Sequence, residues 1–453
     1  MTNAKGKAGE ISTPRLVKNI ILFTLPLMFS NVLQVLFHMA DVAVIGKFSG
    51  TESLGAVGST AVAITIFTGF LIGVGGAVNS LCSRYTGSGN VAELRRTMHT
   101  SLLLSLIIGT VILVIGVTGS RALLSLLGTK DELIDKATDY MRVYFLGMPA
   151  LALFNFGNAV YSASGNTKKP LIFMASAGVL NVILNLFFVI VCQLDVVGVA
   201  LASIISQYLS AGMVVLSLFR EKGDHSLTLS EIRITAHSAR EVLALGIPSG
   251  MQNAIFYIAT LFVQAGINSF DSVMVAGNSA ASNADSLVYE MMDAVYIATA
   301  SFVGRSYGAK NKRDVRRSYL ICQVYSCAVG TVVGLMLFIF GPEFLSLFTS
   351  DPAVVDAGMQ KLAVMSLSYW ISTFMDNAIA GSRGIGKSIV PTAMVIFGSC
   401  IFRIAWIYTV FAYFGTIASL YLLYAFSWGI TAILETSYFV YCYRRLPVSQ
   451  SPI

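Results

Sequence analysis

Apolar stretches of twenty or more residues recur along almost the whole chain. Each stretch is long enough to cross about 30 Å of hydrocarbon as a helix. Charged residues make up only 12% of the chain, whereas about 25% is usual in soluble domains. Because backbone polar groups in lipid must pair within the spanning segment, long uninterrupted runs favour helices over barrel strands. The sequence therefore predicts an all-α membrane protein.

Charged or Pro/Gly-rich gaps separate twelve predicted spans. They are 19–45, 54–81, 98–118, 138–163, 170–193, 196–219, 241–268, 274–302, 318–341, 357–381, 388–413 and 416–442. The first 17 residues are polar and basic, without the apolar core and cleavage site of a signal peptide. We therefore expect the first span to act as its own insertion signal.

Lys and Arg in the short loops are distributed unequally between the two sides of the membrane. The side that bears both termini receives 23 of the 30 basic residues, Arg383 among them, and the opposite side keeps a few such as Lys361. Because basic loops stay in the cytoplasm, we expect both termini to be cytoplasmic, in the plasma (inner) membrane of a prokaryote. The net charge of +7 then reflects topology, and we expect no nucleic-acid partner.

Two loops, 221 residues apart, share a motif. The loop that begins at Arg84 and the loop that begins at Arg305 have five identities at the same spacing, Gly87 with Gly308 included. Further matches in the flanking spans pair Pro26 with Pro248, Asn31 with Asn253 and Pro170 with Pro391. These matches predict an internal duplication.

Each half of this duplication holds an even number of spans, so the two copies have the same orientation and a pseudo-two-fold axis along the membrane normal. We expect a six-helix lobe at 1–220, a cytoplasmic linker at 221–240 and a second six-helix lobe at 241–453. Two parallel halves that rock about a central site are typical of secondary transporters. Duplication also occurs in channels and membrane enzymes.

The sequence contains no Walker A loop, no Rossmann glycine run and no HExxH pair, and its six cysteines stand singly in apolar runs. Nucleotide, dinucleotide and zinc chemistry depend on such motifs. We therefore expect no enzymatic activity and no cofactor other than a coupling ion. A channel is also disfavoured, because no repeat resembles a selectivity filter.

Several segments resemble the MATE family (multidrug and toxic compound extrusion), especially its DinF-like branch. They are Ala-Asp41-Val-Ala-Val-Ile-Gly46, Leu180-Asn181-Val-Ile-Leu-Asn185, Gly198-Val-Ala-Leu-Ala-Ser203 and Asp376-Asn377 followed by Arg383-Gly384. The resemblance covers nearly the whole chain. It implies secondary active efflux of small amphipathic, often cationic compounds in exchange for H⁺ or Na⁺. We expect such a transporter to work in the lipid bilayer as a monomer.

A flippase for lipid-linked saccharide precursors, from the same broad superfamily, is the main alternative. Such a protein needs a cationic cleft for a pyrophosphate, whereas the ionisable residues singled out in the predicted spans are six acids and one base. An ionisable side chain in lipid costs about 2.5–3.5 kcal/mol, so each of these seven residues is a candidate functional group. They are Asp41, Asp285, Glu290, Asp293, Asp376, Glu435 and Arg403.

Asp41 is the strongest candidate for ion coupling. It follows some twenty mostly apolar residues, and its repeat partner Val263 is apolar, so packing shared by the two halves does not explain it. Apolar surroundings favour the protonated form of a carboxyl group, which lets such a residue exchange a proton or a cation near neutral pH. The alternative is a solvated residue at the outer interface without a role.

The family resemblance implies partners for Asp41 on other helices. At the matching positions stand Asn181, Asn185 and Ser203, with Asn155 and Asn158 as neighbours. Asn185 replaces a second Asp of many relatives, which leaves one carboxylate among neutral oxygens. Such a shell suits Na⁺, a hard cation that prefers oxygen ligands, or it hydrogen-bonds a protonated Asp41. No metal site is otherwise predicted.

The remaining candidates are predicted to line a substrate cleft: Asp285, Glu290, Asp293, Asp376 and Arg403. The carboxylates would attract cationic compounds, or line a water-filled vestibule without specific contacts. Arg403 needs an acidic partner, with Asp376 or Glu290 as candidates, and a purely structural ion pair is the alternative. We expect Glu435 to snorkel to the cytoplasmic interface. Phe256 stands where sodium-dependent relatives carry an acid.

Overall fold

The computed structural model describes residues 12–447, which are helical and contain no strand. The first lobe contains α1 (Thr13–Phe48), α2 (Gly50–Ser88), α3 (Val91–Leu126), α4 (Asp131–Phe145), α5 (Met148–Ser164), α6 (Lys168–Leu186), the π-helical turn η1 (Phe187–Val191) and α7 (Asp195–Arg220). A short linker with η2 (Leu229–Glu231) follows. The all-α prediction is confirmed.

The second lobe repeats this order with more interruptions. It contains α8 (Ala236–Ile267), α9 (Ser272–Gly308), α10 (Lys312–Ile339), α11 (Gly341–Leu345), α12 (Pro352–Ser366), α13 (Tyr369–Gly384), α14 (Ile389–Val395), η3 (Ile396–Ile401), α15 (Phe402–Trp406), η4 (Ile407–Phe411), α16 (Ala412–Phe414) and α17 (Ile417–Arg444). The elements η3 and η4 are π-helical turns, so α14 to α16 form one nearly continuous rod.

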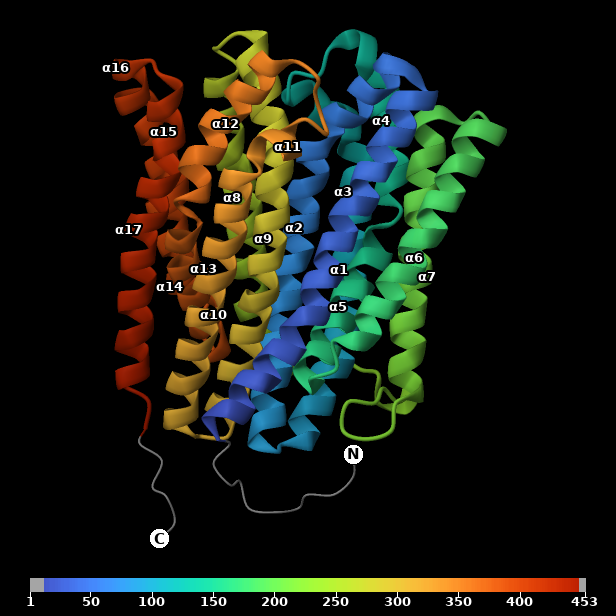
Figure 1. Cartoon of the computed structure of the whole chain (residues 1–453). Helices are drawn as coiled ribbons and strands as arrows, with labels where there is room; N and C mark the ends of the chain where they lie inside the picture. The colour runs from blue at the N-terminus through green and yellow to red at the C-terminus, as the bar shows by residue number, and fades with distance from the viewer. Residues whose placement is uncertain (1–11, 448–453) are drawn as a thin grey trace.

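Among the described residues, nine helical runs are long and apolar enough to span a membrane, and the α4–α5 pair, bent by 45°, makes a tenth. The α12–α13 pair and α9 are more polar, because they carry Lys361, Asp376, Asp285, Glu290 and Asp293. Both run the length of the bundle in Figure 1 and complete the twelve predicted spans.

Both ends of the described chain lie at the same end of the bundle (Figure 1). Arg317, near the start of α10, donates a hydrogen bond to Thr13 Oγ1 at 2.6 Å. Lys312, the first residue of α10, donates to the carbonyl oxygen of Arg444 at the end of α17, at 2.9 Å. We call this end of the bundle the terminal end.

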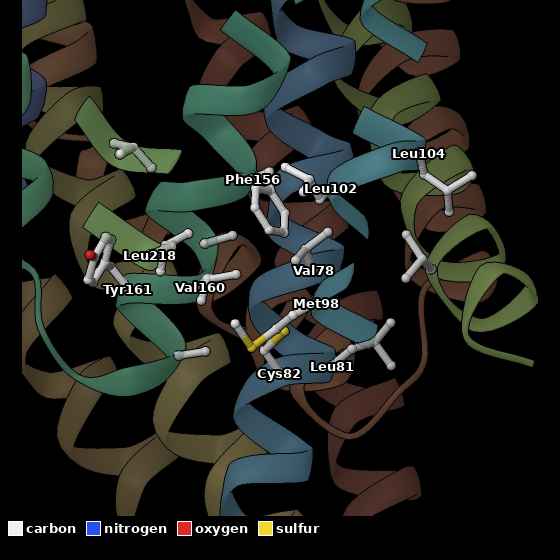
Figure 2. Packing of buried hydrophobic residues seen from close by; sticks show 14 of the residues in the cluster. Val78, Leu81, Cys82, Met98, Leu102, Leu104, Phe156, Val160, Tyr161 and Leu218 are labelled. Atoms are coloured by element: carbon white, nitrogen blue, oxygen red, sulfur yellow. The ribbon is translucent and has the colours of Figure 1, made fainter. Parts of the chain in front are cut away.

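Each lobe has its own apolar core. In the first lobe, side chains from α2, α3, α5 and α7 converge, as Figure 2 shows for Val78, Met98, Phe156 and Leu218. In the second lobe, aromatic side chains dominate: Tyr369 and Trp428 are fully buried and belong to one cluster. Apolar contacts also join the lobes, because the first-lobe cluster takes in Val242 of α8, and Ile20 of α1 packs with Val295 of α9.

Hydrogen bonds between the lobes follow the internal repeat. Asn31 of α1 donates to the carbonyl oxygen of Glu290 in α9, at 3.0 Å. Its repeat partner Asn253 of α8 donates to the carbonyl oxygen of Gly69 in α2, also at 3.0 Å. Glu290 and Gly69 are themselves 221 residues apart. The duplication predicted from sequence is therefore reproduced as symmetric contacts between the halves.

The shared loop motif brings the two backbones into direct contact at the terminal end. A Cβ added to Gly87 would lie 2.0 Å from the carbonyl oxygen of Arg305, and one added to Gly308 would lie 1.9 Å from that of Arg84. The Arg305 guanidinium also donates to the carbonyl oxygen of Ala163 in the first lobe, at 2.7 Å. Only glycine permits this approach at both positions.

The described hydrogen bonds between the lobes reach from the terminal end to about the middle of the bundle. They use residues of α1, α2, α5, α8, α9 and α10. The lobes are thus joined at one end, which is the geometry that permits them to rock.

We expect Gly87→Ala and Gly308→Ala to push the lobes apart at the terminal end, because each new methyl group meets a backbone carbonyl. Overpacking of this kind costs about 1–3 kcal/mol. Thermal unfolding of detergent-solubilised protein measures the loss. Gly76→Ala on α2 is the matched control, since a Cβ there meets nothing within 4 Å. Equal unfolding midpoints for the three variants would contradict the close contact.

Candidate functional site

A carboxylate lies inside the first lobe, where α1, α6 and α7 meet. Asp41 accepts a short hydrogen bond from the Asn185 amide and a longer one, of 3.4 Å, from Ser203 Oγ. Asn181, one turn before Asn185 on α6, accepts from the Asn185 amide at 3.3 Å and donates to Ser203 Oγ at 3.5 Å. We call these four residues the Asp41 cluster.

The sequence explains how the helices bring this cluster together. Asn181 and Asn185 are four residues apart, so they share one face of α6. Asn181, Asn185 and Ser203 are buried, and Asp41 is half-buried. Four of the residues predicted for ion coupling are therefore in hydrogen-bond contact, and their part in ion coupling stays a prediction.

The donor set of the Asp41 cluster fits a small hard cation. Its carboxylate, amide and hydroxyl oxygens are the ligands that such ions prefer. The Asn185 Oδ1 oxygen is buried without a hydrogen-bond partner, so it offers a further acceptor for an incoming ion or for a protonated carboxyl group. A buried acceptor without a partner costs free energy, so an ion or a protonated carboxyl group that pairs with this oxygen would stabilise the protein.

Asn155 and Asn158 do not join this cluster. Asn155 of α5 packs against α2, where a Cβ added to Gly75 would lie 3.3 Å from its own Cβ. The Asn155 amide nitrogen and the Asn158 amide oxygen are buried without hydrogen-bond partners. No described hydrogen bond connects either side chain to Asp41, so their predicted part in ion coupling stays a prediction.

Asp285, predicted to attract cations in a cleft, is instead neutralised inside the second lobe. Its carboxylate forms a 2.7 Å salt bridge with Lys361 of α12 and accepts a hydrogen bond from the Tyr369 hydroxyl. Lys361 is only 5% exposed, so counting it with the loop residues was wrong, although the predicted span 357–381 contains it. It lies within α12, where the Lys ammonium also donates to Ser282 Oγ at 2.7 Å.

Arg383 was assigned to a cytoplasmic loop, which was also wrong, because it is buried in α13. Its guanidinium donates to the Tyr296 hydroxyl and, at 3.0 Å, to Gln252 Oε1. Asp293 and Asp376 are electrostatic neighbours of this guanidinium and of each other. These two predicted cleft acids therefore share one buried cation near the contact between the lobes.

Glu290 and Glu435 differ in their surroundings. Glu290 is half-buried beside Asp293, with its backbone bonded to Asn31. Glu435 is 0% exposed, and both of its carboxyl oxygens lack a partner. The expectation that Glu435 snorkels was wrong, because its position on α17 faces the interior of the lobe, towards Arg383 and Asp376.

Arg403 has no acidic partner in the part of the chain that the structure describes, contrary to prediction. Its guanidinium carbon lies 4.5 Å from the ring centre of Phe256 and 4.8 Å from that of Tyr424. Its Nε donates to Ser427 Oγ at 3.2 Å. Aromatic rings at such distances stabilise a cation without a counter-ion.

Two parallel helical repeats, joined at one end and holding ionisable groups within each bundle, are typical of a membrane transporter. The MatE family profile matches residues 26–187 and again residues 248–409, once in each lobe. This chain belongs to the MatE family, the multidrug and toxic compound extrusion transporters. The double match also confirms the internal repeat.

Relatives of known type agree over most of the chain. The probable multidrug resistance protein YpnP of Bacillus subtilis is 28% identical over 399 residues, covering 86% of this chain and 88% of its own. A protein named FAD transporter from Shewanella oneidensis is 25% identical and covers 81% of each chain. The fold matches the outward-facing structure of a multidrug resistance MATE transporter with a TM-score of 0.88, at 22% identity, over 95% of this chain and 96% of the other.

We expect Lys361→Met to destabilise the second lobe by about 3–5 kcal/mol, because it leaves the Asp285 carboxylate buried without its ion pair. The double variant Lys361→Met/Asp285→Asn should recover most of this loss, since neither charge remains. Unfolding titrations in detergent measure both effects. Lys130→Met is the control, because Lys130 is exposed. A double variant as unstable as the single one would contradict the ion-pair assignment.

Proposed function

We propose that this protein is a secondary active antiporter that exports amphipathic and cationic organic compounds in exchange for H⁺ or Na⁺. The observation that supports this most is the Asp41 cluster, a single carboxylate held by amide and hydroxyl groups inside the first lobe. Apart from the coupling ion, the protein needs no cofactor. It acts as a monomer.

The position of Asp41 on α1 suggests how ion binding reaches the lobe contact. The same helix carries Asn31, which bonds to Glu290 of the second lobe. When Asp41 is protonated or bound to Na⁺, its charge is compensated and α1 packs against α6 and α7. When the ion leaves, the bare carboxylate favours a different arrangement of α1, which changes the contact between lobes. An ion gradient then biases the two states.

Substrate recognition is proposed for the half-buried acids near the lobe contact, Glu290, Asp293 and Asp376. Their carboxylates outnumber the one nearby guanidinium, Arg383, and so favour a cationic group. The relative named FAD transporter extends the compounds worth testing to aromatic phosphates.

We expect Asp41→Asn to slow gradient-driven dye efflux in everted vesicles by about 5–150-fold, the range of typical coupling energies. The amide keeps the size of the side chain and removes its titration and its charge. Asp356→Asn is the control, because Asp356 is exposed. Wild-type efflux by the Asp41→Asn variant would overturn the proposed function.

Two further arms of this assay identify the coupling ion. Removal of Na⁺ should stop wild-type efflux if Na⁺ is exchanged, and a protonophore should stop it if H⁺ is exchanged. The treatment that stops wild-type efflux should leave the remaining efflux rate of the Asp41→Asn variant unchanged. Insensitivity of the wild type to both treatments would also overturn antiport.

Both termini are proposed to be cytoplasmic, in the inner membrane of a prokaryote. In a Cys192→Ser background, since Cys192 is exposed, we expect a membrane-impermeant thiol reagent to label Lys130→Cys in intact cells. Lys222→Cys, in the linker, should be labelled only after the cells are opened. The opposite pattern would reverse the orientation.

A further inference from the structure

The residues around the Asp41 cluster have repeat partners of different chemical character in the second lobe. At the offset of 221, Tyr140 corresponds to Lys361 and Ser203 to Tyr424. Asn181 corresponds to Phe402, directly beside Arg403. Where the first lobe gathers a carboxylate and neutral oxygens, the second lobe gathers two cationic side chains.

The structure supports this correspondence. Tyr140 and Ile64 belong to one apolar cluster in the first lobe. Their repeat partners, Lys361 and Asp285, form the 2.7 Å salt bridge of the second lobe. Similarly, α6 packs on α7 through Asn181 and Ser203, and the matching rod packs on α17 through Arg403 and Ser427.

Of the two cations, only Arg403 is left without a negative charge. Lys361 is paired with Asp285, whereas the guanidinium of Arg403 is 1% exposed and touches aromatic rings and one hydroxyl. Its Nη1 and Nη2 atoms are buried without hydrogen-bond partners. Buried donors without acceptors carry a large desolvation cost. We therefore expect an acceptor to bind at the edge of the guanidinium that carries Nη1 and Nη2.

A second unpaired donor belongs to the aromatic cluster that Arg403 touches. The indole Nε1 of Trp428 is buried without a partner, next in the chain to Ser427, which binds Arg403. The Trp428 ring is 5.6 Å from that of Tyr424, which Arg403 contacts. The Arg403 rod also contains the π-helical turns η3 and η4. Such turns occur frequently at functional sites.

We propose that Arg403 and Trp428 form an oxyanion-binding subsite in the second lobe, which takes the carboxylate or phosphate group of an aromatic substrate. The edge of a guanidinium presents two parallel N–H donors that match such a group in bidentate geometry. The aromatic rings of Phe256 and Tyr424 provide the apolar surroundings for the rest of the compound. The assignment of the ligand as a transported compound rests on the proposed export function.

The test is a binding titration with phenyl phosphate, in which Trp428 serves as the reporter. Replacing Trp370 and Trp406 by Phe leaves Trp428 as the single tryptophan of the three. We expect saturable quenching by phenyl phosphate and none by benzylammonium. Arg403→Gln should raise the Kd about tenfold to a hundredfold, the loss expected for hydrogen bonds to a charged group.

Arg403→Lys tests the geometry in a variant that keeps the charge. It should bind more weakly than the wild type, because an ammonium lacks the planar edge. Asp356→Asn should keep its Kd within about twofold of the wild type, since Asp356 is exposed and takes no part in either site. Arg403-dependent binding together with unimpaired Asp41→Asn efflux would refute only the proposed antiport.

The source of the oxyanion is decided in vesicles. If vesicles with phosphatidylglycerol raise the apparent Kd of phenyl phosphate competitively, relative to vesicles of phosphatidylcholine alone, then a lipid phosphate occupies the subsite. If they do not, the site is available to a transported compound. Absence of saturable binding by the wild type, or equal Kd values for folded Arg403→Gln and Arg403→Lys and the wild type, would overturn the subsite.

Discussion

The close backbone contact between the lobes is the constraint on which the rest of this structure depends. Gly87 against Arg305 and Gly308 against Arg84 bring the two halves together at the terminal end. Symmetric hydrogen bonds from Asn31 and Asn253 continue the contact towards the middle of the bundle. Because the bonds stop there, a small change in one lobe can be expressed as a rocking motion about this joint.

Ionisable groups are divided between the lobes in a way that the symmetric scaffold does not require. The first lobe holds one carboxylate among neutral oxygens, on the helix that also reaches the lobe contact. The second lobe neutralises Asp285 with Lys361 and leaves Arg403 against aromatic rings. The two lobes share one architecture, and different residues at a few buried positions give the charged groups different surroundings.

Sequence reasoning identified the fold, the repeat and the Asp41 cluster, because these depend on long apolar runs, fixed offsets and a motif. It misplaced Lys361 and Arg383, which it treated as loop residues, and Glu435, which it placed at an interface. When a Lys or Arg lies near the end of a predicted span, sequence reasoning assigns it to the adjoining loop by default. Only the packing of neighbouring helices shows that such a side chain points inward and finds an acid or a hydroxyl.

The sequence by itself determined that this chain is a duplicated helical membrane protein, since hydropathy and repeat spacing are properties of the chain alone. Tertiary structure decided which charges are paired. Asp285 of α9 meets Lys361 of α12, which is 76 residues further along the chain, while Arg403 meets no acid among the described residues. The free energy of a charge in lipid depends on its nearest neighbours in space, and pairwise contacts between distant helices are fixed only when the helices pack.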